Sequence, residues 1–177
     1  VVAIQYVLGL TGSEEGKHFI CSNDKYLTAI TELLDDEAET VANDAHRCLV
    51  NLASDEQMSK KLLNSEDVVQ NIIKCCLLPD SPHADTACMT LSNLAHWEES
   101  AQAITSYLEK CGENVGIHAI IDVFCRVTNR LHYLASFLSN LTQVRDARKL
   151  ILDQNKCIIQ KLIPFISFNE SNLICLP

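Results

Sequence analysis

The sequence predicts an all-α fold built from a repeated group of helices. A five-residue phrase recurs at residues 49–53 (LVNLA), 91–95 (LSNLA) and 138–142 (LSNLT), with a weaker copy at residues 7–11 (VLGLT). The third residues of successive copies are 42, 42 and 47 positions apart. The chain has only 6% aromatic residues, five glycines and four prolines, but 47% hydrophobic residues. This composition favours helices packed through aliphatic side chains over β-sheets.

A helical period of roughly 40–47 residues is typical of armadillo and HEAT repeats. We therefore expect a right-handed α-solenoid of the armadillo/HEAT type, with about three full repeats and partial repeats at both ends. Residues 1–177 would form a single solenoid, whose repeats end near residues 11, 53, 95 and 142. Residues 145–168 would be a partial last repeat, and residues 169–177 a divergent tail. Because both ends are apolar, we expect a fragment of a longer protein.

Each repeat is expected to contain two shorter helices and one longer helix. Residues 1–11 would belong to the last helix of an incomplete repeat. Helix starts are indicated at Ser65, at Asn155 and at Ser81, which can cap a helix that begins with Pro82. The expected helices are, in chain order, 14–21, 25–34 and 38–53; 56–63, 66–78 and 82–95; 98–110, 115–127 and 130–142; 145–152 and 156–166.

Charge and cysteine content restrict the partners and the compartment. The net charge is −9 and the pI is near 5.0, so binding gains nothing from neutralising phosphates, and we expect neither nucleic acid nor a membrane as partner. No apolar run approaches the ~18 residues that a membrane-spanning helix needs. The nine cysteines are odd in number and follow no disulfide framework, which indicates a reducing compartment. We therefore expect a cytoplasmic protein.

The longer helix of each repeat carries two stripes of side chains. In the helix at residues 38–53, Ala45, Cys48, Leu49 and Leu52 share a face at ~100° per residue, and we expect them in the core. A second stripe lies roughly 120° away and recurs in the next two repeats. Stacking would align these stripes along the concave side. The candidate partner-binding residues on them are Asp44, Arg47, Asn51, Thr86, Met89, Asn93, Tyr133, Ser136 and Asn140.

Asparagine at Asn51, Asn93 and Asn140 suits two roles. Its amide offers both a donor and an acceptor, so it can pair with the backbone of an extended peptide without reading its side chains. The same amides can instead tie neighbouring helices together by bonding backbone groups. Both roles are compatible, and the sequence does not choose between them.

Longer strings resemble one eukaryotic family. Residues 6–12 (YVLGLTG), 132–142 (HYLASFLSNLT) and 156–164 (KCIIQKLIP) look like the armadillo-like chaperone that assists folding of translation elongation factor 2. The resemblance covers about residues 5–168, the N-terminal part of that family. It implies a protein client, elongation factor 2, and the cytosolic chaperonin as a second partner. We also expect the chain to be a monomer. After Phe168 the sequence departs from the family, and no family site can be carried over residue by residue.

An armadillo scaffold or an importin-like peptide-binding adaptor is the alternative. Importin-type grooves resemble an asparagine ladder with a tryptophan four residues before each asparagine. Those positions are Arg47, Met89 and Ser136 here. Without aromatic rings, the stems of bound lysines have no surface on which to stack.

An enzyme is a different class of protein, and the motifs argue against it. No Gly-rich phosphate loop, His-Glu-x-x-His or Cys-x-x-Cys pattern is present. Cys75 and Cys76 are adjacent, which is poor geometry for one metal ion. His46 lies on the flank of a core helix, where packing is the usual role. We therefore expect no catalytic residues, no metal site and no cofactor.

Overall fold

The computed structural model describes residues 2–78, 80–111, 116–126, 131–153 and 158–166, and all regular structure in these segments is helical. The helices are α1 (Val2–Thr11), α2 (Glu14–Cys21), α3 (Asp24–Glu32), α4 (Glu39–Ala53), α5 (Glu56–Leu63), α6 (Glu66–Leu77), α7 (Ala84–Ala95), α8 (Glu98–Lys110), α9 (Ile117–Arg126), α10 (Leu131–Leu141), α11 (Arg145–Leu152) and α12 (Ile158–Ile166). The predicted all-α class is confirmed.

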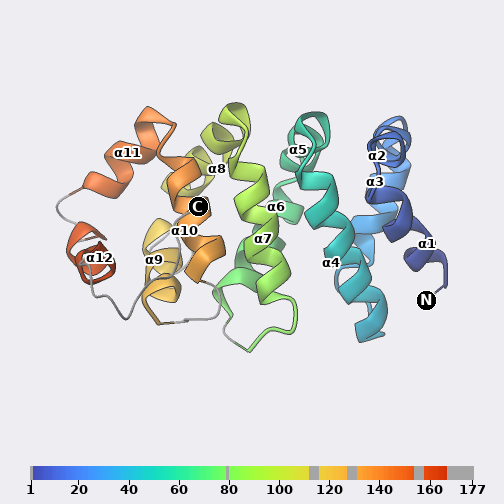
Figure 1. Ribbon diagram of the computed structural model, residues 1–177, viewed down its shortest axis with the longest axis horizontal. Helices are drawn as coiled ribbons and strands as arrows, with labels where there is room; N and C mark the ends of the chain where they lie inside the picture. The colour runs from blue at the N-terminus through green and yellow to red at the C-terminus, as the bar shows by residue number, and fades with distance from the viewer. Residues whose placement is uncertain (1, 79, 112–115, 127–130, 154–157, 167–177) are drawn as a thin grey trace.

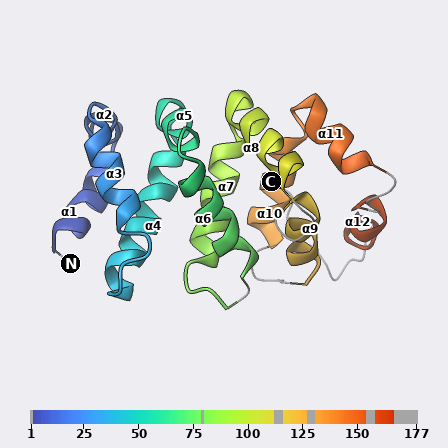
Figure 2. The ribbon, with the colours of Figure 1, turned by 180° about the vertical axis from the view of Figure 1, so that it is seen from behind.

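The helices pack in rows, in which each contacts the helix three places further along the chain. One row is α1, α4, α7 and α10, a second is α2, α5, α8 and α11, and α6, α9 and α12 form a third. Figures 1 and 2 show these rows running along the long axis of the molecule, from α1–α3 at one end to α11 and α12 at the other. The arrangement is that of an α-solenoid, in which each layer contacts its neighbours.

The predicted core face of α4 is confirmed. Ala45, Cys48, Leu49 and Leu52 are all fully buried. The corresponding stripe of α7 is Ala87, Thr90, Leu91 and Leu94, and that of α10 is Leu134, Phe137, Leu138 and Leu141; all of these side chains are buried. The common register explains why the same phrase recurs, since its leucines fill the same place in successive layers.

Two of the shortest helices, α2 and α5, begin at side-chain caps that their own sequences provide. The Ser13 hydroxyl accepts a hydrogen bond from the backbone N–H of Gly16, and the Asp55 carboxylate accepts one from Met58 at 2.9 Å. These side chains satisfy backbone donors that have no partner within the helix. The predicted bounds of α2, α5, α8 and α11 agree with the structure at both ends.

The predicted start of α7 at Pro82 is wrong by two residues. Ser81 accepts, through its backbone carbonyl, a hydrogen bond from the N–H of Ala84 at 3.1 Å, which closes a turn over residues 81–84. Pro82 occupies the second position of this turn, where its fixed φ is favoured. Ser81 therefore begins this turn and does not cap the helix.

The remaining differences from the predicted helices are shifts at the ends. α3, α4 and α6 differ from the predicted ranges by one or two residues at one or both ends, and α10 ends one residue earlier than predicted. The predicted helix ends at residues 115, 127, 130 and 156 lie outside the described residues. At Ser65 the helix starts as predicted, but its side chain makes no capping hydrogen bond. The predicted cap Asn155 and the tail 169–177 lie outside the described residues. Across the described segments, no helix combines the length and apolar character needed to cross a bilayer.

Candidate protein-binding face

The predicted binding residues lie on three adjacent helices of one row. Asp44, Arg47 and Asn51 are on α4, Thr86, Met89 and Asn93 on α7, and Tyr133, Ser136 and Asn140 on α10. These helices pack side by side, with α1 beyond α4 (Figure 1). The structure therefore brings the nine residues onto one row of helices, which we call the α1–α4–α7–α10 face.

The three asparagines tie successive helices of this face together. The Asn51 amide donates to the Thr11 hydroxyl at 3.1 Å, the Asn93 amide to the Val50 carbonyl at 3.0 Å, and the Asn140 amide to the Ser92 carbonyl at 3.1 Å. Each bond crosses from one helix to the preceding helix of the row. Of the two roles that the sequence left open, the tying role is the one with contacts in this structure.

Two further residues of the same kind were not found from the sequence. Thr11 is fully buried, and its hydroxyl donates to the Leu8 carbonyl at 2.9 Å while it accepts from Asn51. Gln143 donates to the Ala95 carbonyl at 2.7 Å. Gln143 lies three residues after Asn140, in the turn that follows α10, and its closeness to Asn140 in the sequence was the available signal.

The other six candidate residues differ in how much of them a partner could reach. Asp44 is buried and Arg47 exposed, with 3.5 Å between the Asp44 carboxylate and the Arg47 guanidinium. The Thr86 hydroxyl is occupied, since it donates to the His83 carbonyl at 2.8 Å. The half-buried side chains are Met89, Tyr133 and Ser136. Binding of a partner by the nine residues stays a prediction.

A pair of histidines packs between α4 and the turn before α7. The rings of His46 and His83 are stacked, with centroids 4.3 Å apart and planes 13° from parallel. Burial, and then the neighbouring His83, lower the pKa of His46 from 6.5 to about 4, against the opposing effects of Asp35 and of a hydrogen bond with the Leu34 backbone. His46 is therefore neutral at pH 7, in agreement with the packing role predicted for it.

The thiol of Cys48, which bonds with Thr11 beside the Asn51 tie, is protonated at pH 7. Burial, the largest effect, raises the pKa of Cys48 from 9.0 to about 11, although its hydrogen bond with Thr11 acts in the opposite direction. Burial likewise raises the pKa of Cys75 and of Cys125. Because the thiolate is the nucleophilic form, these three thiols are poorly suited to nucleophilic chemistry.

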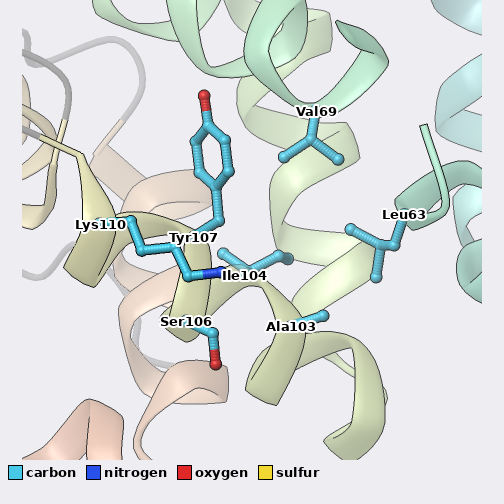
Figure 3. Close-up of a pocket in the computed structure, with 7 residues that line it drawn as sticks. All are labelled: Leu63, Val69, Ala103, Ile104, Ser106, Tyr107 and Lys110. Carbon is cyan, nitrogen blue, oxygen red and sulfur yellow. The ribbon is translucent and has the colours of Figure 1, made fainter. Parts of the chain in front are cut away.

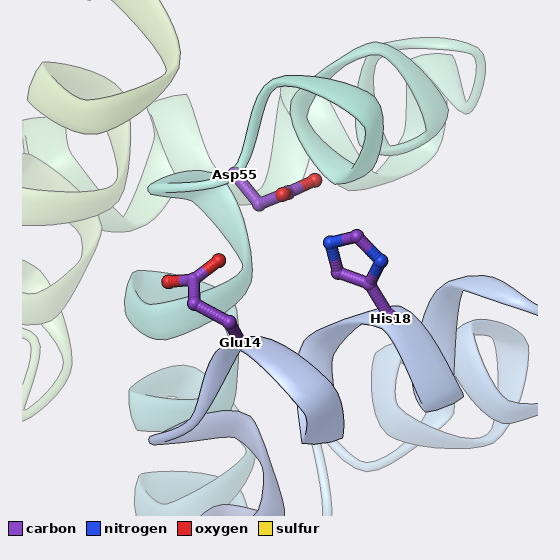
Figure 4. Close-up of side chains that lie close together, drawn as sticks. All are labelled: Glu14, His18 and Asp55. Carbon is purple, nitrogen blue, oxygen red and sulfur yellow. The ribbon is translucent and has the colours of Figure 1, made fainter.

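Glu14, His18 and Asp55 form a group of metal-ligating side chains at the junction of α2 and α5. Their ligand atoms lie within 4.8 Å of one another (Figure 4). Glu14 already pairs with the Lys17 ammonium at 2.8 Å, and Asp55 caps α5. These contacts account for the positions of both carboxylates, so the group carries no assignment as a metal centre.

A cavity of about 110 Å³ lies between α5, α6 and α8. Figure 3 shows Leu63, Val69, Ile104 and Tyr107 around it, with Lys110 as its charged residue. A volume of this size corresponds to a few water molecules at ~30 Å³ each. None of the nine candidate residues lines it, and its polar lining side chains are Ser106, Tyr107 and Lys110.

Known proteins resemble this chain over most of its length. Proteins named HGH1 homolog are 34% identical over 173 residues in Danio rerio, 37% over 182 residues in Drosophila melanogaster and 31% over 177 residues in Homo sapiens. These matches cover 96%, 96% and 97% of this chain, and 45%, 49% and 45% of the relatives. The chain thus spans slightly less than half the length of these relatives.

A crystal structure of an engineered protein has the same fold, with a TM-score of 0.73 at 20% identity; the match covers 92% of this chain and 38% of that protein. Residues 75–174 match the family described as "Domain of unknown function (DUF383)". Since that match covers more than half of the chain, the chain belongs to the DUF383 family, and its relatives named HGH1 homolog confirm the family resemblance predicted from the sequence.

Proposed function

We propose that the chain is a non-catalytic, cytoplasmic chaperone or adaptor that binds translation elongation factor 2 as a client and links it to the cytosolic chaperonin. The observation that carries the proposal is homology to HGH1 homologs over almost the whole chain. The resemblance at residues 6–12, 132–142 and 156–164 supplies the client. The motifs found in the sequence give no support to catalysis, and a monomer is part of the proposal.

We further infer that the fold is a right-handed solenoid of the armadillo type with about three full repeats. Each row is made of every third helix of the chain, and this spacing supports the inference. Solenoids present long continuous surfaces, and proteins of this architecture use them to hold other polypeptides. The α1–α4–α7–α10 face is the surface on which the recurring phrase and the candidate residues coincide.

The client contacts are assigned first to Arg47, Met89, Tyr133 and Ser136. Arg47 has an exposed side chain, and the other three are partly accessible. Arg47, Met89 and Ser136 occupy the same place on three successive helices, four residues before each asparagine. The asparagine amide nitrogens already donate hydrogen bonds within the chain. The asparagines therefore hold the helices of this face together and contribute less to direct contacts with the client.

The test is binding of purified elongation factor 2 to the chain with Arg47→Ala, Met89→Ala and Ser136→Ala combined. Truncation of central contact residues costs about 1–2 kcal/mol each, so we expect affinity to fall by at least ~10-fold. The matched control combines Lys25→Ala, Gln70→Ala and Glu109→Ala, which are exposed residues of α3, α6 and α8. We expect this control to bind as the unchanged chain does.

Two results would overturn the proposal. Failure of the unchanged chain to bind elongation factor 2 would refute the client. Equal binding by the triple variant and its control would place the client surface outside the α1–α4–α7–α10 face. Circular dichroism of all variants establishes that they are folded, so that loss of binding is not loss of structure.

A further inference from the structure

Two cysteines of the second layer meet inside the core. Cys76 lies on the buried side of α6 with Ile72 and Ile73, and Cys88 lies on the buried side of α7 with Leu91. The two helices are adjacent in the chain and pack against each other. Their Sγ atoms are 3.1 Å apart, and both residues are fully buried.

This contact distinguishes the pair from the other cysteines of the described segments. Cys21, Cys48, Cys75, Cys111 and Cys125 make no such sulfur contact with one another. A disulfide has an S–S distance of ~2.05 Å, so the two sulfurs must approach by about 1 Å to form one.

We propose that Cys76 and Cys88 are an oxidative modification site, at which a small hydroperoxide joins them in an intrachain disulfide. One sulfur attacks a peroxide oxygen and becomes a sulfenic acid, and the first water or alcohol leaves. The second thiol attacks this sulfur, the S–S bond forms and a water leaves. Two thiols lose two hydrogen atoms and one peroxide is reduced, and a dithiol reductant reverses the bond by exchange.

Burial of both sulfurs controls the rate of the reaction. Neither sulfur is exposed, so the peroxide reaches them when α6 and α7 separate locally. Once formed, the bond fixes α7 against α6. α7 carries Thr86, Met89 and Asn93, so oxidation would hold the middle of the α1–α4–α7–α10 face in one position. The inference is independent of the client proposed above.

The experiment treats the folded chain with hydrogen peroxide and measures its intact mass with and without a dithiol reductant. We expect a reversible loss of the mass of two hydrogen atoms. Cleavage before Asp80 and Asp85 separates Cys76 from Cys88, so the two resulting peptides should appear joined. Cys76→Ala and Cys88→Ala should each abolish the joined peptide.

Cys75→Ala is the matched control, because this neighbour is half-buried and bonds to Asn71 at 3.4 Å. We expect it to keep the cross-link, and in this background the oxidised protein should melt about 5 °C above the reduced protein. The proposal is overturned if peroxide oxidises other cysteines while Cys76 and Cys88 stay reduced. It is also overturned if the cross-link survives in either single variant or uses Cys75.

Discussion

At the scale of single residues, several buried polar side chains bond to or stack on a residue of another helix or of the turn before it. The buried hydroxyls of Ser59 on α5 and Ser100 on α8 lie 2.8 Å apart, and the rings of His46 and His83 stack between α4 and the start of α7. Such groups are costly to bury alone. The two hydroxyls pair with each other, whereas the buried Nε2 of His46 and Nδ1 of His83 have no hydrogen-bond partner among the described residues. These contacts fix the position of one layer of helices relative to the next more specifically than aliphatic packing alone would.

The His46 side chain should make the stability of the protein depend on pH. Its pKa is about 4 in the folded chain and 6.5 when unfolded, so the unfolded state binds more protons between these values. The contribution of neutral His46 to the free energy of unfolding is therefore fully present above pH 6.5. This contribution falls by about 3 kcal/mol as the pH decreases towards 4. Urea unfolding at a series of pH values measures this loss, and His46→Leu should reduce it. An unchanged pH dependence in His46→Leu would show that other groups cause it.

The asparagine ties should contribute to stability individually. Asn93→Ala removes the bond to the Val50 carbonyl and should lower the free energy of unfolding by about 1 kcal/mol. Asn51→Ala and Asn140→Ala should behave in the same way. The control is Asn43→Ala, an exposed residue of α4, which should change stability by less than about 0.5 kcal/mol. Urea denaturation separates the two outcomes, and equal effects at Asn93 and Asn43 would contradict the tying role.

At the scale of the helices, the sequence around each end decides where the chain can turn. α1 leads into α2 through Gly12 and Ser13, whose N–H groups donate to the Gly9 and Leu10 carbonyls. This short link brings the first turn of α2 against the end of α1. Gly16 is the residue at the contact, and only a residue without a side chain fits there.

Gly9 and Gly16 provide a matched pair of glycine substitutions in adjacent helices. A Cβ at Gly16 would overlap the backbone carbonyl of Leu10, so Gly16→Ala should cost about 3 kcal/mol or more. A Cβ at Gly9, inside α1, would have no neighbour within 4 Å. Gly9→Ala should therefore stabilise the protein by about 0.5–1 kcal/mol through helix propensity. Chemical denaturation checks both signs, and similar values for the two variants would contradict the close approach.

At the scale of the whole molecule, stability passes from layer to layer. α7 contacts α4, α6, α8 and α10, whereas α1 at one end contacts α2 and α4. In such a stack, stability is approximately the sum of each layer and its interfaces with its neighbours. A destabilising substitution in a central helix should therefore also destabilise the layers on both sides of it. A destabilising substitution in a terminal helix should affect only the adjacent helices.

Hydrogen exchange on two core variants tests this spread. Leu91→Ala in α7 and Ile4→Ala in α1 each remove a buried side chain, at a cost of about 2–5 kcal/mol. Leu91→Ala should accelerate amide exchange in α4, α6, α8 and α10 as well as in α7. Ile4→Ala should accelerate exchange in α1 and its neighbours and leave α10 unchanged. Exchange changes confined to α7 in the first variant would contradict coupling between layers.

Much of the fold was predictable, because it depends on short-range pattern. The recurring leucines placed the core face of α4, and four helices were bounded correctly at both ends by their own composition. The start of α7 was missed because Ser81 and Pro82 suit a turn as well as a helix start, and local sequence does not distinguish the two. For the candidate site, the sequence placed nine residues on one row of helices but did not identify Thr11 and Gln143, whose partners lie on other helices.

The sequence by itself determined an all-helical chain, its repeat interval and the side of each helix that is buried, since these follow from the spacing of apolar residues along one helix. Only the tertiary structure decided that the asparagine amides bond to the preceding helix, that His46 stacks on His83 and that Cys76 touches Cys88. Those contacts depend on how far one layer is shifted and rotated against the next. That offset results from the packing of all the side chains between them.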